Sequence, residues 1–349
     1  MGSEDMTIVN DDEAYSGLAK LGAAPLWRYL GDLFRPEPRS AAVPTVWHYE
    51  SLRKYAMYFA EHLPIEDAQR RVLMLVNPGL QEPPATVNTL YAGIQILLPG
   101  EQAPAHRHTS NAFRFVIEGS GVYTTVDGER VHMHPGDLLM TAGWQWHDHF
   151  HPGDDPMMWL DGLDYPLINM LETGFHELHP DEFQKSVAPD NISTRQFIHG
   201  RLNPTWARQA SPNTPVGNYP WAETERALAA IGDDVDGCEY DGVALEYTNP
   251  LTGGSVLPTI GCQIQRFKPG FVGRPRRHTP SVICHVVRGH GSTQVGDTLL
   301  EWHPNDVFVI PGWAFYQHRN AAWDEDAVLF TYSNEPVMKA LNLYREESL

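Results

Sequence analysis

The sequence predicts a mainly β protein in which two barrels of the same kind follow a helical N-terminal arm. Two observations carry this prediction. The 349-residue chain repeats a series of short stretches: 98–100 recurs at 268–270, 116–121 at 286–291, 134–137 at 303–306 and 142–149 at 311–318. Repetition on this scale indicates two copies of one fold. The repeated stretches are also β-rich runs bounded by Gly, Pro and Asp, which is typical of strands and turns.

The first segment, residues 1–68, is predicted to form the helical arm. Leucines recur at helical spacing over 11–35, with a break near Pro25, and a second helix is expected over 49–62. The first residues include acids and lack the basic and apolar regions of a signal peptide, so we expect a cytoplasmic protein. Nothing in this arm suggests chemistry.

Residues 69–172 are predicted to form the first barrel. One strand is expected over 89–98, where a Pro-Gly pair ends it. Because side chains alternate along a strand, Ile94 and Ile96 share one face and should enter the hydrophobic layer between sheets. The opposite face would line a pocket, and it carries Tyr91, Gly93 and Gln95.

Three histidines of this barrel are predicted to bind a metal ion. His106 and His108 are two residues apart, so on a strand both imidazoles point to the same side. The Asp127-Gly128 pair predicts a hairpin that returns the chain, bringing His147 alongside them. Three neutral imidazoles suit divalent iron, zinc, copper or nickel and leave coordination positions free for a substrate. The alternative is ordinary packing, since the chain has 17 histidines and an isolated pair is more often surface or core.

Other histidines of the first barrel are assigned by their positions. His149 is two residues after His147, so on a strand its side chain points to the same side. It could therefore face the pocket as a hydrogen-bond donor or proton relay without binding metal. His132, His134 and His151 lie near turns and are expected at the surface.

Residues 173–241 are predicted to connect the barrels. The segment has scattered Pro, Asn and Asp, with one helix expected over 221–231. We expect it to wrap the surface in an ordered form, because its large aromatic residues require burial. These residues are Trp206, Tyr219 and Trp221.

Residues 242–349 form the predicted second barrel, in which the histidine set is not preserved. Arg276 takes the place of His106 and Tyr316 that of His147, whereas His278 is retained. One imidazole is too few for a stable site of a first-row metal, so we expect this barrel to be metal-free and structural.

The composition excludes some classes of partner. A net charge of −19 offers no basic field for nucleic acid or an anionic membrane, although a small acid could still bind beside local arginines. No apolar run is long enough to span a bilayer. The three cysteines, Cys238, Cys262 and Cys284, are few and widely spaced, so a disulfide framework is not expected and each should sit as a small apolar residue.

The histidine stretch resembles the two characteristic motifs of the cupin superfamily. Gly100, the His-x-His pair, Gly119 and the later Pro-Gly-Asp at 135–137 fall at the expected distances. The resemblance implies a bicupin of two double-stranded β-helix, or jelly-roll, barrels. Most metal-binding cupins carry a Glu where this chain has Ala112. Without that carboxylate the site is a neutral three-His face, and an anionic bidentate substrate would supply the missing charge.

Among cupins, the local sequence His-Arg-His-x-x-Asn-Ala-Phe-Arg-Phe is similar to that of gentisate dioxygenases, a group that includes salicylate and 1-hydroxy-2-naphthoate dioxygenases. The resemblance extends over nearly the whole chain. It implies ferrous iron, Fe(II), held by His106, His108 and His147. It further implies cleavage of gentisate by O2 to maleylpyruvate, in the catabolism of aromatic compounds by a homotetramer.

The same resemblance implies roles for further residues. Arg114 and Arg70 correspond to arginines that bind the substrate carboxylate. Ala112 stands where cupins place a ligand, so Arg114, which shares its parity, should also face the metal; the alternative is that it only pairs with a carboxylate such as Asp161. Salicylate-cleaving relatives carry Trp where Tyr91 stands, and gentisate enzymes carry Tyr. The other pocket groups, expected to act in catalysis, are His149, Gln95 and Asp161.

The nearest alternative is the same reaction on salicylate or 1-hydroxy-2-naphthoate by an enzyme of the same fold. Two further classes also remain open at this point. A metal-dependent cupin isomerase or decarboxylase would not require dioxygen, but such enzymes usually keep a Glu at the position of Ala112. A binding or storage bicupin would have no catalytic activity, but such proteins tend to lose the histidine triad and to be secreted.

Overall fold

The computed structural model describes residues 10–199, 202–206 and 211–349. The chain divides into two compact units, Met1–Arg39 and Ser40–Leu349. In the first unit, Asn10 caps the N-terminus of α1 (Asp11–Lys20), and its side chain accepts the Glu13 N–H. A 3₁₀ turn, η1 (Leu26–Arg28), and α2 (Leu30–Leu33) follow. The prediction of helices interrupted near Pro25 is therefore confirmed.

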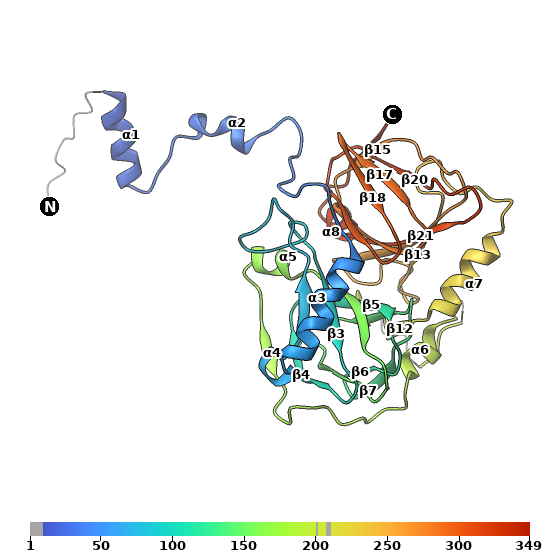
Figure 1. The fold of residues 1–349 in the computed structure, drawn as a ribbon. Helices are drawn as coiled ribbons and strands as arrows, with labels where there is room; N and C mark the ends of the chain where they lie inside the picture. Colours follow the sequence, from blue (N-terminus) through green and yellow to red (C-terminus); the bar gives the residue numbers. More distant parts are fainter. Residues whose placement is uncertain (1–9, 200–201, 207–210) are drawn as a thin grey trace. The chain divides into compact units, whose positions relative to one another are not determined.

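The described part of the second unit contains two barrels, each made of a six-stranded and a five-stranded sheet (Figure 1). In hydrogen-bonded order, the six-stranded sheet of the first barrel consists of β12 (Asn218–Tyr219), β8 (Leu138–Thr141), β5 (Ala112–Glu118), β10 (Met157–Leu163), β3 (Tyr91–Leu97) and β2 (Arg71–Met74). Its five-stranded sheet consists of β11 (His176–Leu178), β4 (Gln102–His108), β9 (His147–Phe150), β6 (Tyr123–Val126) and β7 (Glu129–His132).

The second barrel has the same plan. Its six-stranded sheet consists of β1 (Thr45–Trp47), β19 (Val307–Ile310), β16 (Val282–Arg288), β21 (Ala327–Ser333), β14 (Gly261–Phe267) and β13 (Val243–Tyr247). Its five-stranded sheet consists of β18 (Thr298–Trp302), β17 (Gly291–Val295), β20 (Tyr316–Arg319), β15 (Arg276–His278) and β22 (Glu346–Ser348). Each sheet has open edges, so each barrel is a pair of facing sheets and not a closed cylinder. The mainly β bicupin fold is confirmed.

The strand register shows how far the duplication extends. Tyr91 to Leu97 pair with Leu163 to Met157 in the first barrel, and Gly261 to Phe267 pair with Ser333 to Ala327 in the second. A short helix follows the last of these strands in each barrel: α5 (Tyr165–Met170) follows β10, and α8 (Glu335–Ala340) follows β21. The remaining helices of this unit are α3 (Tyr49–His62), α4 (Ile65–Ala68), α6 (Ile192–Phe197) and α7 (Trp221–Ile231).

Each barrel carries a strand from the segment that precedes the other barrel, which the sequence did not predict. β1 comes before the first barrel but pairs with β19 of the second, and β12 comes before the second barrel but pairs with β8 of the first. In both cases a buried aspartate holds the first turn of the following helix. Asp306 accepts the Tyr49 N–H at 2.8 Å, and Asp137 accepts the Trp221 N–H at 2.9 Å.

Replacing Asp137 with Ala should destabilise the fold by about 2–4 kcal/mol. Each buried donor left without its acceptor costs about 1–3 kcal/mol, and the total is reduced because some of the N–H groups that Asp137 now accepts can hydrogen-bond to water instead. The carboxylate also accepts the His134 N–H and the Asn218 side-chain amide. Denaturant unfolding measures the loss. Asp154→Ala, at an exposed position, is the control; equal effects of the two substitutions would contradict the account.

The largest apolar core lies between the two barrels. Phe115 stacks on Phe330 of the second barrel with ring centroids 4.3 Å apart. Ile94 and Ile96 belong to this core, so the layer predicted between sheets joins one barrel to the other. The Tyr332 hydroxyl also crosses the interface and donates to the Tyr91 carbonyl at 2.8 Å. The pocket face of β3 is thereby backed by the second barrel.

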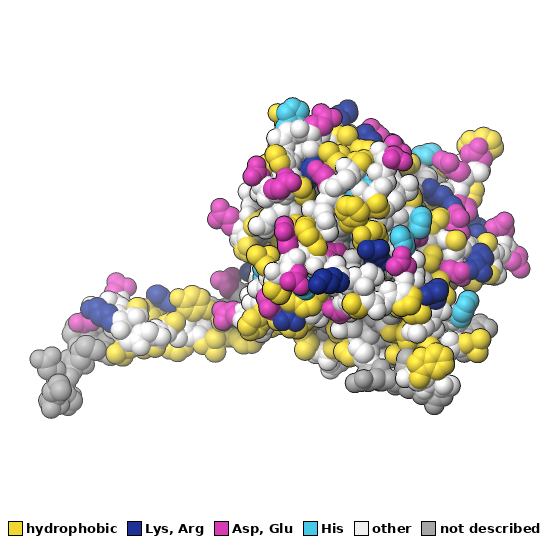
Figure 2. Space-filling model, turned by 90° about the horizontal axis from the view of Figure 1, so that it is seen from below, with side chains coloured by type: hydrophobic (Ala, Val, Ile, Leu, Met, Phe, Trp, Pro, Cys, Tyr) yellow, Lys and Arg dark blue, Asp and Glu magenta, His cyan; other side chains and the backbone are white. Residues whose placement is uncertain are grey.

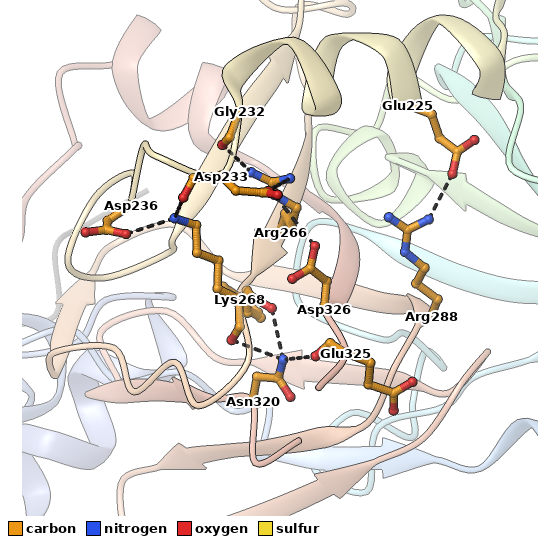
Figure 3. Close-up of polar contacts among 11 residues, drawn as sticks. Glu225, Gly232, Asp233, Asp236, Arg266, Lys268, Arg288, Asn320, Glu325 and Asp326 are labelled. Atoms are coloured by element: carbon orange, nitrogen blue, oxygen red, sulfur yellow. Dashed lines mark hydrogen bonds and ion pairs between the residues drawn. The ribbon is translucent and has the colours of Figure 1, made fainter. Parts of the chain in front are cut away.

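The predicted connection, 173–241, is more deeply integrated than a linker, because it supplies β11 and β12 to the sheets of the first barrel. Charged side chains tie α7 and the turn after it to the second barrel (Figure 3). Arg288 donates to Glu225 at 2.8 Å, and Lys268 donates to Asp236 at 2.9 Å. The expectation that Trp206 is buried is wrong, since it is 79% exposed.

The surface agrees with the composition. On the face drawn in Figure 2, Lys and Arg side chains are scattered among Asp and Glu and form no continuous basic patch. Cys262 and Cys284 are buried thiols, as expected, whereas Cys238 is exposed, contrary to expectation. Among the described residues, no helix is both long and apolar enough to cross a membrane.

Candidate active site

The structure brings His106, His108 and His147 together inside the first barrel. β4 and β9 pair so that His106 lies opposite His147, and His108 follows on the same face of β4. Nitrogen atoms of the three rings all lie within 4.8 Å of one another. The predicted hairpin forms, but it joins β6 to β7, and the pairing of β9 with both β6 and β4 is what delivers His147. The set could hold one metal ion.

Backbone carbonyl groups orient the three rings. The Nδ1 atom of each imidazole lies near a carbonyl oxygen: that of Pro104 at 3.4 Å for His106, that of Ser110 at 2.8 Å for His108, and that of Gln145 at 3.0 Å for His147. A neutral imidazole that donates from Nδ1 keeps the lone pair of Nε2 free for a metal. This support favours three Nε2 ligands.

Burial keeps these imidazoles neutral. It lowers the pKa of His106 to about 2, with a further contribution from the Arg70 charge, and lowers the pKa of His108 to about 4. Burial followed by the Arg114 charge places the pKa values of His147 and His149 well below the usual range. A cation therefore need not displace protons from the triad near neutral pH.

Acidification should destabilise the metal-free protein below pH 6.5. The unfolded chain gains protons on these histidines near pH 6.5 whereas the folded chain does not, so stability is lost as the pH falls, by on the order of 1 kcal/mol per pH unit for each imidazole. Burial raises the pKa of Asp161 to about 6, so this group offsets part of the loss between pH 6 and 4. Urea unfolding at pH 7.5, 6.5 and 5.5 checks the slope, which His149→Gln should reduce. Equal midpoints at the three pH values would refute it.

Two arginines lie beside the triad. Arg114, on β5, donates to Thr141 at 2.6 Å, and its Nε lies 3.7 Å from the Asp161 carboxylate. Arg70, just before β2, donates to the Pro104 carbonyl at 3.1 Å. Burial lowers the pKa of Arg70 to about 9, and the Arg114 charge lowers it further, so the two cations share one region. The Asp161 pairing foreseen as an alternative is present, but one carboxylate does not neutralise two guanidinium groups.

Three buried residues of the first barrel carry polar atoms without hydrogen-bond partners. Within the described part of the chain, Arg114 Nε, Gln95 Nε2 and both ring nitrogens of His149 make no hydrogen bond. Buried polar groups are nearly always satisfied, so the unsatisfied groups on β5, β3 and β9 indicate a missing ligand. Arg114 Nε and Gln95 Nε2 are thus donors that lack an acceptor.

Tyr91 and Gly93 pack closely on β3. Tyr91 is buried, and its ring lies 5.1 Å from that of Tyr165. Gly93 leaves room for it, because a Cβ added there would lie 2.2 Å from the Tyr91 hydroxyl and 2.7 Å from Val72 Cγ1. The glycine gap predicted on this face is therefore occupied by the tyrosine.

The sequence missed part of the site's outer wall. A cavity of about 390 Å³ beside the triad is lined by Arg70, His106, His176 and Leu178 among others. β11 pairs with β4 so that His176 lies opposite His108, and the His176 ring lies 5.3 Å from that of His106. The only sequence signal was a histidine in a segment with no predicted strand.

The equivalent place in the second barrel differs. The Arg276 guanidinium donates to the Tyr316 hydroxyl at 2.6 Å and also pairs with Asp241. His278 Nε2 lies 3.1 Å from the same hydroxyl. A fixed cation thus stands among these groups, and His278 and His318 line the same cavity. The structural role of this barrel stays a prediction.

Comparisons with known proteins agree with this geometry. A cupin domain family matches residues 93–162. The chain is 37% identical to gentisate 1,2 dioxygenase 1 of Aquipseudomonas alcaligenes over 336 residues, 96% of this chain and 95% of that protein. It is 37% identical to 5-aminosalicylate 1,2-dioxygenase of a Comamonas species, over 100% and 93% of the two chains. A crystal structure of salicylate 1,2-dioxygenase from Pseudoaminobacter salicylatoxidans with gentisate has a TM-score of 0.90 at 35% identity, covering 99% and 97% of the two chains.

Proposed function

The chain belongs to the cupin family of ring-cleaving 1,2-dioxygenases that includes the gentisate and salicylate enzymes, and we propose that it is an Fe(II)-dependent gentisate 1,2-dioxygenase. The proposed reaction converts gentisate and O2 to maleylpyruvate by cleaving the ring between the carboxyl-bearing carbon and the adjacent hydroxyl-bearing carbon. The single observation that carries the proposal is a neutral triad of histidines with the guanidinium groups of buried Arg114 and half-buried Arg70 beside it.

The donor set favours this chemistry. Three imidazoles without a carboxylate leave the full charge of a divalent ion uncompensated, so an acid that binds through two oxygens is the complementary ligand. When bound, Fe(II) would offer adjacent positions for this acid and for O2 and would pass electrons from the ring to oxygen. His106, His108 and His147 would hold the iron through Nε2.

The surrounding residues position the substrate and its proton. Arg114 and Arg70 bind the carboxylate by charge-assisted hydrogen bonds, which fixes the ring in one orientation. The unpartnered, neutral imidazole of His149 accepts or shares the phenolic proton. Gln95 donates to a substrate oxygen, and Asp161 orients Arg114.

Tyr91 supports gentisate over salicylate. A tyrosine places a hydroxyl at the wall of the pocket, where it can hydrogen-bond to the second ring hydroxyl, which salicylate lacks. Such polar recognition discriminates more strongly than apolar contact. Oxygen uptake with gentisate, salicylate and 1-hydroxy-2-naphthoate tests this: we expect gentisate to give the highest kcat/KM, and equal rates on all three acids would contradict the preference. Turnover that continues without O2 would instead point to an isomerase or decarboxylase.

We also propose that the enzyme acts as a cytoplasmic homotetramer, as its resemblance to gentisate dioxygenases implies. Light scattering coupled to size-exclusion chromatography should give four times the 39.3 kDa chain mass. A monomer at micromolar concentration would contradict this assembly.

A further inference from the structure

A second cluster of metal-binding side chains lies outside the triad, on the second barrel. His48, His303 and Asp306 each offer a ligand atom, and these atoms lie within 4.8 Å of one another. His303 and Asp306 lie in the turn between β18 and β19, whereas His48 is the residue before α3, more than 250 positions earlier in the chain. We propose that these residues bind a divalent cation of the zinc class and that the ion clamps α3 to the second barrel.

The distances fit such an ion. Donor atoms bound at roughly 2.0–2.1 Å in a tetrahedron lie about 3.3 Å apart. His48 Nδ1 lies 2.8 Å from Asp306 Oδ2, and His303 Nδ1 lies 3.8 Å from the same oxygen, so the two separations bracket this value. The two imidazoles are exposed and can rotate by the few tenths of an ångström required. Binding would replace the proton between His48 Nδ1 and the carboxylate by the cation.

The carboxylate is already fixed for this role. Asp306 is buried, and its two oxygens accept the backbone N–H groups of Tyr49 at 2.8 Å and His303 at 3.0 Å. Hydrogen bonds of this kind hold a ligating carboxylate in one orientation. Two imidazoles and one carboxylate leave at least one position for water, as expected for a site at the surface.

The first barrel provides an internal comparison. His134 and Asp137 occupy the equivalent turn, with His134 Nδ1 3.3 Å from the carboxylate, but Pro220 takes the place of His48 before α7. The Asn218 side chain also donates to Asp137 there. The first barrel therefore has only two of the three donors, and its carboxylate is occupied by an amide.

A cation at this cluster would join the two barrels. His48 precedes α3, which packs on β2 and β3 of the first barrel, and Arg53 of α3 pairs with Glu118 of β5 at 2.8 Å. The ion would hold the beginning of the same helix on the second barrel. The expected consequence is a more stable two-barrel unit, with no requirement for the ion in catalysis.

Zinc binding to the full-length protein tests the site. Because the triad can also bind zinc, we would compare four proteins by equilibrium dialysis and elemental analysis: His108→Ala alone, and the same variant combined with His48→Ala, His303→Ala or His134→Ala. Adding His48→Ala or His303→Ala should weaken zinc binding by more than the roughly 10–100-fold expected for loss of a supporting contact. His134→Ala, the matched control, should leave it unchanged.

Two further measurements make the test independent of residual binding at the altered triad. Zinc should raise the thermal unfolding midpoint of the iron-loaded wild-type enzyme, and His48→Ala should abolish this rise without changing turnover. Crystals grown with zinc should show an anomalous peak beside Asp306 Oδ2. Zinc affinity that is indifferent to His48 and His303, or the absence of that peak, would overturn the proposal without affecting the proposed dioxygenase activity.

Discussion

Replacing His108 with Ala should remove iron and turnover together. Two imidazoles hold a divalent ion poorly, and the loss should exceed the roughly 10–100-fold that removal of a supporting contact costs. The Ser110 carbonyl that orients the ring would lose its donor, but the remaining pocket would stay in place. Iron analysis after anaerobic purification, combined with a gentisate assay, measures both effects.

The duplication supplies the matched control for this variant. His278 occupies the equivalent position in the second barrel, beside Arg276 and Tyr316. His278→Ala should change stability at most and leave iron content and turnover intact. An iron-loaded, active His108→Ala enzyme would exclude His108 as a ligand, and a folded but inactive His278→Ala enzyme would refute a purely structural second barrel.

Replacing Arg114 with Ala should leave iron bound but weaken the acid substrate. A lost charge-assisted hydrogen bond costs about 1.5–3 kcal/mol, which corresponds to about a 10–150-fold lower kcat/KM. Arg70 remains to supply some of the charge, so activity should persist. Steady-state kinetics with gentisate and iron analysis of the same sample test both parts of this expectation.

Hydroquinone, which is gentisate without its carboxylate, separates charge recognition from general damage. Its weak binding should be nearly the same in the wild type and in Arg114→Ala. Arg288→Ala, on the equivalent strand of the second barrel, should behave as wild type. If Arg114→Ala loses its iron, or weakens hydroquinone as much as gentisate, the arginine does not bind the substrate carboxylate.

The sequence predicted the triad because its signal is local. His106 and His108 are separated by the period of a strand, and the repeated turns indicate a fold that returns His147 to them. The alternation of side chains likewise predicted that Gln95 and His149 face the pocket; both are buried, and Gln95 Nε2 and both ring nitrogens of His149 make no hydrogen bond. Such predictions succeed because an alternating strand has only two faces.

Other features depend on pairings between distant segments and leave no local signal. His176 reaches the site because β11 adds to the edge of β4. β1 precedes the first barrel but joins the second, and β12 returns from the connection to the first barrel. His151, expected at the surface because it lies near a turn, is buried, with Nε2 2.6 Å from the Asp155 carbonyl. Burial at a turn depends on what covers it, which sequence position alone does not reveal.

Anaerobic titration of metal-depleted enzyme with Fe(II), followed by gentisate-dependent oxygen uptake, tests the central claim most directly. Activity should rise linearly and reach a plateau at one iron per chain, and His108→Ala should show no such rise. Full activity without iron, or a plateau at two irons per chain that requires the second barrel, would contradict the account.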